Sequence, residues 1–144
     1  MKVIFSILTI FCVAITMVAC QTQQAETMVL LDEKISQIKI SKSNGTGEMN
    51  EEMLLSIRDK ESLDVFEKAI TTAVKQSGKV DKSKPDYDVV VEYEGDEGGL
   101  PPHGIHLWLG QENEKSTFMY ITDDSIYLTS PQMTKELRRL ILSE

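Results

Sequence analysis

The chain has 144 residues, of which 41% are hydrophobic and 26% charged, and its formal net charge is −8. This composition is typical of one folded domain and excludes an intrinsically disordered chain. The acidic balance also excludes a nucleic-acid-binding protein, because it repels the phosphate backbone.

The beginning of the chain predicts a secretory signal. Residues 1–19 carry one charge, Lys2, followed by an uncharged and mostly apolar run that ends in a small residue. A transmembrane helix needs about 20 apolar residues and usually more flanking charge. A cleaved signal is therefore the better interpretation, and its removal changes the net charge from −8 to −9, because Lys2 is lost.

Cys20 follows the apolar run directly. The sequence MVAC, residues 17–20, resembles the bacterial lipobox, which implies a diacylglycerol on the Cys20 sulfur, cleavage before Cys20 and a chain held on the outer side of the cell membrane by its lipid. The alternative is an ordinary signal peptide followed by a chance cysteine. Cys12 is lost with the signal, so no intramolecular disulfide is expected in the mature chain. A catalytic cysteine needs a folded pocket beside a base, which the end of a tether does not provide.

Residues 20–34 are predicted to be a lipidated cysteine and tether. The tether is polar at first and turns apolar at residues 28–31, which either begin a strand or pack as an arm. Two half-buried strands follow at residues 35–43 and 53–59, where apolar and polar side chains alternate. The glycine-containing turn between them predicts a hairpin.

The hydrophobic period changes to three and four residues in residues 59–78, which predicts an amphipathic helix. Asp59 is expected to cap its start and Gly78 to close its end. Its apolar residues are Leu63, Phe66, Ile70, Ala73 and Val74.

Four further strands and a second helix are predicted in the C-terminal part. The strands are residues 87–93, 105–110, 117–121 and 125–130. Ser130 supplies a capping hydroxyl and Pro131 suits the first helical position. The apolar face of this helix consists of Met133, Leu137, Leu140 and Ile141.

The predicted order of elements is ββαββββα. Short links between consecutive strands require antiparallel pairing. Two helices cannot cover both faces of a six-stranded sheet, so we expect an α+β fold with a mainly antiparallel sheet of about six strands and both helices on one face. Residues 35–144 form this single domain.

Five stretches, taken together and in this order, resemble the YhfM-like domain of small Bacillus lipoproteins: IKISKSNG, DKESLDVFEKAI, IHLWLG, STFMYI and IYLTSPQM. The resemblance covers roughly residues 35–142. It implies a lipoprotein of the Gram-positive cell envelope, and it assigns no activity and no catalytic residue.

No catalytic or phosphate-binding pattern is present, because the sequence has neither a G-x-S-x-G nor an H-E-x-x-H motif. We therefore expect no enzyme and no cofactor. His103 and His106 offer an alternative, a metal-binding or envelope-stress module, although side chains three apart on a strand point to opposite faces. The acids nearby are Glu92, Glu94, Asp96 and Glu97.

The leading hypothesis is a binding module that uses the open face of the sheet. Ile105, Leu107 and Leu109 are expected to face the helices, which leaves the opposite face free. The residues expected on that free face are Trp108, His106 and Tyr127, with Met119, Ile121 and Thr129 nearby. An aromatic cluster there suits an envelope protein or a small ligand. The alternative is that Trp108 is buried beneath residues 28–31 or a loop.

Overall fold

The computed structural model describes residues 24–78, 83–95 and 99–142. Within these ranges the elements are β1 (Ile35–Lys42), β2 (Met53–Ile57), α2 (Lys60–Thr71), β3 (Val74–Gln76), β4 (Tyr87–Tyr93), β5 (His103–Trp108), β6 (Thr117–Tyr120), β7 (Ile126–Leu128) and α3 (Pro131–Leu142). The predicted α+β fold is confirmed, with one strand more than expected. The predicted signal and Cys20 lie outside the described residues.

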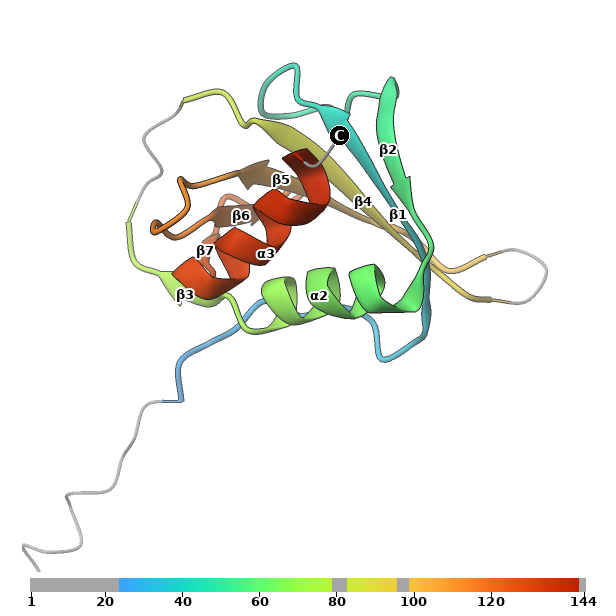
Figure 1. Cartoon of the computed structure of the whole chain (residues 1–144), viewed down its shortest axis with the longest axis horizontal. Helices are drawn as coiled ribbons and strands as arrows, with labels where there is room; N and C mark the ends of the chain where they lie inside the picture. Colours follow the sequence, from blue (N-terminus) through green and yellow to red (C-terminus); the bar gives the residue numbers. More distant parts are fainter. Residues whose placement is uncertain (1–23, 79–82, 96–98, 143–144) are drawn as a thin grey trace, which may run out of the picture.

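The strands form one antiparallel sheet in the order β2-β1-β4-β5-β6-β7-β3. β2 and β3 are therefore its two edge strands. Figure 1 shows α2 and α3 on the same side of the sheet, as expected for an antiparallel sheet with one covered face.

Both helix starts follow the predicted capping chemistry. The Asp59 carboxylate accepts a hydrogen bond from the backbone N–H of Ser62 at 2.9 Å. The Ser130 hydroxyl accepts one from the N–H of Met133 at 3.2 Å. These bonds satisfy backbone donors that have no partner within the helix.

The end of the first helix differs from the prediction of residues 59–78, because α2 ends at Thr71. The hydroxyls of Thr71 and Thr72 donate to the carbonyls four residues earlier, at 2.8 and 2.6 Å. β-branched side chains and such back-bonding both weaken a helix. The chain then extends as Val74–Gln76 and pairs with β7, which supplies the additional strand.

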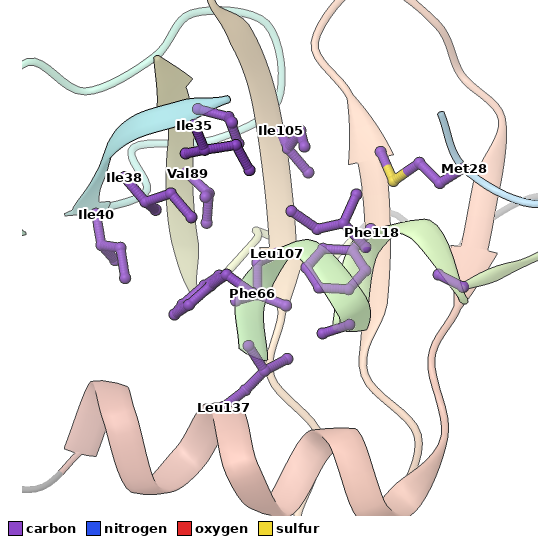
Figure 2. Close-up of a cluster of buried hydrophobic side chains, with 14 of the residues drawn as sticks. Met28, Ile35, Ile38, Ile40, Phe66, Val89, Ile105, Leu107, Phe118 and Leu137 are labelled. Atoms are coloured by element: carbon purple, nitrogen blue, oxygen red, sulfur yellow. The ribbon is translucent and has the colours of Figure 1, made fainter. Parts of the chain in front are cut away.

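The hydrophobic core lies between the sheet and the two helices. Phe66 of α2 and Leu137 of α3 are fully buried there and meet side chains of the central strands (Figure 2). Ile105 and Leu107 belong to this core, so the predicted orientation of their strand is confirmed. The face of the sheet toward α2 and α3 is therefore buried in the core.

Residues 26–31 pack against the domain as an N-terminal arm. Thr27 pairs with Val74 in antiparallel fashion, which places the arm along β3. The Met28 side chain is 1% exposed and is part of the core (Figure 2). Of the two alternatives for residues 28–31, the structure shows the arm.

The arm gives a direct stability prediction. We expect Met28→Ala to lower the free energy of unfolding by about 2–5 kcal/mol, because it leaves a cavity in the core. The adjacent Val29 is 68% exposed, so Val29→Ala is a matched control that should change stability by about 0.5 kcal/mol or less. Urea unfolding measures both. Equal effects of the two substitutions would contradict the packing of the arm.

Candidate functional site

The face of the sheet opposite the helices carries a row of side chains that crosses four strands. Trp108 pairs with Thr117, Thr117 with Leu128, and Leu128 with Val74. Directly paired residues in an antiparallel sheet point to the same side. The row therefore runs from β5 across β6 and β7 to the edge strand β3.

A second row runs parallel to the first. His106 pairs with Met119, Met119 with Ile126, and Ile126 with Gln76. The apolar members of the two rows form what we call the open face: Val74, Trp108, Met119, Ile126 and Leu128. None of them belongs to the core cluster, and all except Met119 are half-buried. The open face is thus an apolar surface separate from the core.

Trp108 is held in place at the end of the open face. Its indole Nε1–H donates to the backbone carbonyl of Ser83 at 2.9 Å. Its ring meets the imidazole of His106 edge-on, with centroids 6.3 Å apart. Trp108 is half-buried, and the loop that contains Ser83 lies against its indole nitrogen, so it is neither a core residue nor fully exposed.

His106 points to the expected face but is buried, which corrects its predicted role as a surface residue. Its Nδ1 lies 2.8 Å from an Asp88 carboxylate oxygen, and both side chains are buried. Its Nε2 accepts a hydrogen bond from the backbone N–H of Gly47 at 3.3 Å. Nδ1 therefore carries the proton and donates to Asp88, which is the arrangement of a neutral imidazole.

This buried pair fastens the loop of residues 43–52 onto the sheet. Asp88 uses its second carboxylate oxygen to accept the N–H of Asn50 at 2.8 Å. Gly47 has a φ of 126°, a backbone conformation that favours glycine. The loop thus lies over His106 and Asp88.

Gly104 permits a close approach of the same loop. A Cβ atom at this position would lie 3.0 Å from Cγ2 of Ile121 and 3.4 Å from Sδ of Met49. The missing side chain therefore makes room for Met49 against the sheet. No local sequence pattern predicts this contact.

Tyr127 lies on the helix side of the sheet, so its predicted place beside Trp108 is wrong. It pairs with Phe118, a core residue, and is 5% exposed. Its ring packs edge-on against Tyr120 at 5.8 Å. Its neighbours in the chain, Ile126 and Leu128, occupy the open face instead. The sequence shows the alternation of this strand, but it does not show which of its two faces points toward the helices.

The two histidines lie on opposite faces and cannot share a metal ion. His103 pairs with Val91 of the core face, whereas His106 lies on the loop side. The Tyr93 hydroxyl lies 2.6 Å from His103 Nδ1. Among the described residues, no group of three or more His, Cys, Asp or Glu side chains is placed to hold a metal.

The nearby acids are partly engaged in ion pairs. Glu92 pairs with Lys39 and Glu94 with Lys34, each at 2.6 Å. Asp96 and Glu97 lie outside the described residues. The geometry therefore gives no support to a metal site built from both histidines and these carboxylates.

Tyr93 connects the N-terminal arm to His103. The Tyr93 hydroxyl accepts the N–H of Leu31 at 3.4 Å and also forms a hydrogen bond with His103 Nδ1 at 2.6 Å. Burial lowers the pKa of His103 and raises the pKa of Tyr93. Both shifts favour the neutral forms of the two side chains.

Comparison with known protein families matches residues 31–144 to the YhfM protein family. The chain belongs to the YhfM family. The family match covers the whole sheet and both helices, which confirms the resemblance seen in the sequence. A comparison with curated proteins gives no match.

A solved structure with a similar fold is that of a thioesterase-like protein from Clostridium sporogenes ATCC 15579. The two chains are 16% identical with a TM-score of 0.58, over 81% of this chain and 100% of that chain. At this identity the likeness shows a common fold alone.

None of the helices in the described part of the chain is both long enough and apolar enough to span a membrane. The lipid anchor predicted at Cys20 falls before the first described residue. The lipid anchor at Cys20 therefore stays a prediction from the sequence.

Acid is expected to destabilise the domain through His103. Its pKa is lowered from the ordinary value of 6.5 in the folded state. As the pH falls, His103 therefore binds its proton at a higher pH in the unfolded chain than in the folded one. The stability that the neutral side chain contributes above pH 6.5 is lost as the pH falls through the folded pKa. His103→Gln removes this titration. It should reduce the decrease in the free energy of unfolding between pH 6.5 and about 5, a range in which most carboxylates are still ionised. Urea unfolding at several pH values measures it. An unchanged pH profile would contradict the assignment.

Proposed function

We propose that this member of the YhfM family is a lipid-anchored, extracytoplasmic binding module of the cell envelope. Residues 1–20 support the anchor, because a short apolar run with one basic residue leads directly into a lipobox-like cysteine. A net charge of −9 in the mature chain keeps the body of the domain away from anionic lipid head groups. Two acyl chains suffice for stable anchoring.

The binding role rests on the open face. Its four half-buried apolar side chains and the buried Met119 come from four strands and lie on the side of the sheet opposite α2 and α3. The 43–52 loop is fastened to the neighbouring part of the sheet through Asp88 and His106. A contiguous apolar patch beside a partly exposed tryptophan is typical of a protein interaction site.

A protein suits this surface better than a small ligand does. A small-molecule site is usually a concave, mostly apolar pocket. The cleft of ≈ 550 Å³ between residues 31–36 and α2 is lined largely by charged side chains, and it contains the ion pairs Lys34–Glu94 and Lys60–Asp64. The open face instead extends over four strands with a tryptophan at one end, and apolar and aromatic residues are enriched at the centres of protein interfaces.

We expect no enzymatic activity. The similarity to a thioesterase-like protein raises hydrolysis as a question, and hydrolysis needs a base that can reach substrate. The Asp88–His106 pair is buried, and the second imidazole nitrogen is bound to Gly47. This histidine serves to hold a loop.

Replacing Cys20 tests the anchor. We expect the natural protein to begin at Cys20 and to carry a diacylglycerol, which intact mass measurement detects. Cys20→Ser should release the protein from the membrane fraction, because it removes the thioether link to the lipid. An unmodified thiol, or a natural chain that still begins at its first methionine, would contradict the proposal.

Replacing Trp108 tests the open face. We expect Trp108→Ala to weaken partner capture in a crosslinking pull-down from native envelopes by about 30-fold, which corresponds to a hot-spot loss of about 2 kcal/mol. Leu54→Ala is the matched control, because Leu54 is 55% exposed on the distant edge strand β2. It should leave capture unchanged.

Unfolding curves of both variants accompany the binding assay. If Trp108→Ala unfolds the domain, Ile126→Ser serves as a second disruption of the same face. Equal capture by the folded open-face variant and the Leu54→Ala control would refute the binding role.

A further inference from the structure

The N-terminal arm is fixed to β3 from residue 26 onward by backbone hydrogen bonds in both directions. The N–H of Lys75 donates to the carbonyl of Glu26 at 2.8 Å, and the N–H of Met28 donates to the carbonyl of Ala73 at 3.0 Å. This is the bonding of a short antiparallel ladder. The arm therefore forms one antiparallel bridge on that edge of the sheet, and in Figure 1 the blue segment runs past β3 before it reaches β1.

Side chains fasten the arm at three further points. Met28 is buried in the core. The Tyr120 hydroxyl accepts the N–H of Val29 at 2.8 Å and donates to the carbonyl of the same residue. Lys75 forms an ion pair with Glu26 at 2.8 Å. Because these contacts come from different elements, the arm belongs to the rigid body of the domain.

This fixed point limits how far the domain can move from its lipid. Six residue steps separate Cys20 from Glu26, and they span at most about 22 Å whatever their conformation. The opposite edge strand, β2, lies six strand spacings away, on the order of 29 Å at about 4.8 Å each. The two edges of the sheet are therefore not equivalent with respect to the lipid.

We propose that the arm holds the domain with its β3 edge next to the phospholipid surface and its β2 edge directed away from it. This inference rests on the proposed lipid anchor at Cys20. The rows of the open face end at Val74 and Gln76 of β3, so the open face stands beside the bilayer. A partner of this face meets it at the membrane surface.

Charge does not provide this orientation. Lys75 is already paired with Glu26, which raises the pKa of the lysine, and the Asp123 carboxylate raises it further. Asp124 next to it is exposed. In the described part of this edge the acidic groups outnumber Lys75, so these groups do not attract anionic lipids. The orientation therefore depends on the short linker and should disappear without the lipid.

Matched fluorescent labels can measure the orientation. Ser77 follows β3 directly and Ser56 lies on β2, and both are exposed. Ser77→Cys and Ser56→Cys each provide one thiol for a maleimide dye, because the sulfur of Cys20 carries the lipid. The lipidated proteins are placed in phosphatidylcholine–phosphatidylglycerol vesicles that contain a quencher on the lipid head groups.

We expect the dye at position 77 to lose most of its fluorescence and the dye at position 56 to keep most of its own. Equal quenching of the two dyes on vesicle-bound protein would overturn the proposed orientation. If neither dye is quenched and the protein does not float with the vesicles, the lipid anchor itself fails, and the orientation fails with it. The two failures are therefore distinguishable.

Releasing the arm provides a second test. Met28→Asp places a charge in the core position of the arm and should detach it, so that the linker becomes longer. In this background the dye at position 77 should lose its excess quenching, while circular dichroism reports whether the sheet persists. If the folded variant keeps the full difference between the two dyes, the arm does not set the orientation.

Discussion

The backbone pairing between residues 26–28 and β3 is the constraint on which the rest of the account depends. It converts the end of a predicted tether into part of the sheet and delivers Met28 to the core. It also covers part of one exposed edge, where unpaired backbone groups would invite association with another chain. The lipid attachment proposed at Cys20 is consequently linked to a rigid body by only a few residues.

The sheet separates two tasks. Its covered face packs Phe66 and Leu137 against the central strands, which stabilises the domain. Its other face is divided between a loop, fastened by the buried Asp88–His106 pair, and an apolar surface around Trp108. Because the core does not need the open face, a partner can bind there without competing with the packing that holds the domain together.

Local patterns in the sequence predicted much of the fold, including the cap at Asp59 and the alternation of β5. They failed where the outcome depends on distant contacts. The helix ends at Thr71 because the Thr71 hydroxyl donates to a backbone carbonyl of the preceding turn and residues 74–76 pair with β7. Tyr127 was assigned to the wrong face because strand parity has no absolute direction without a partner. The burial of His106 depends on a loop 59 residues away in sequence, which no periodicity reveals.

Hydrogen–deuterium exchange of the arm tests the central claim most directly. The amides of Met28 and Lys75 donate the two bonds that join the arm to β3. The account predicts that both exchange slowly, in the same time range as amides of the central strands, because opening them requires disruption of the core. Exchange of both amides as fast as that of an unstructured peptide would contradict it.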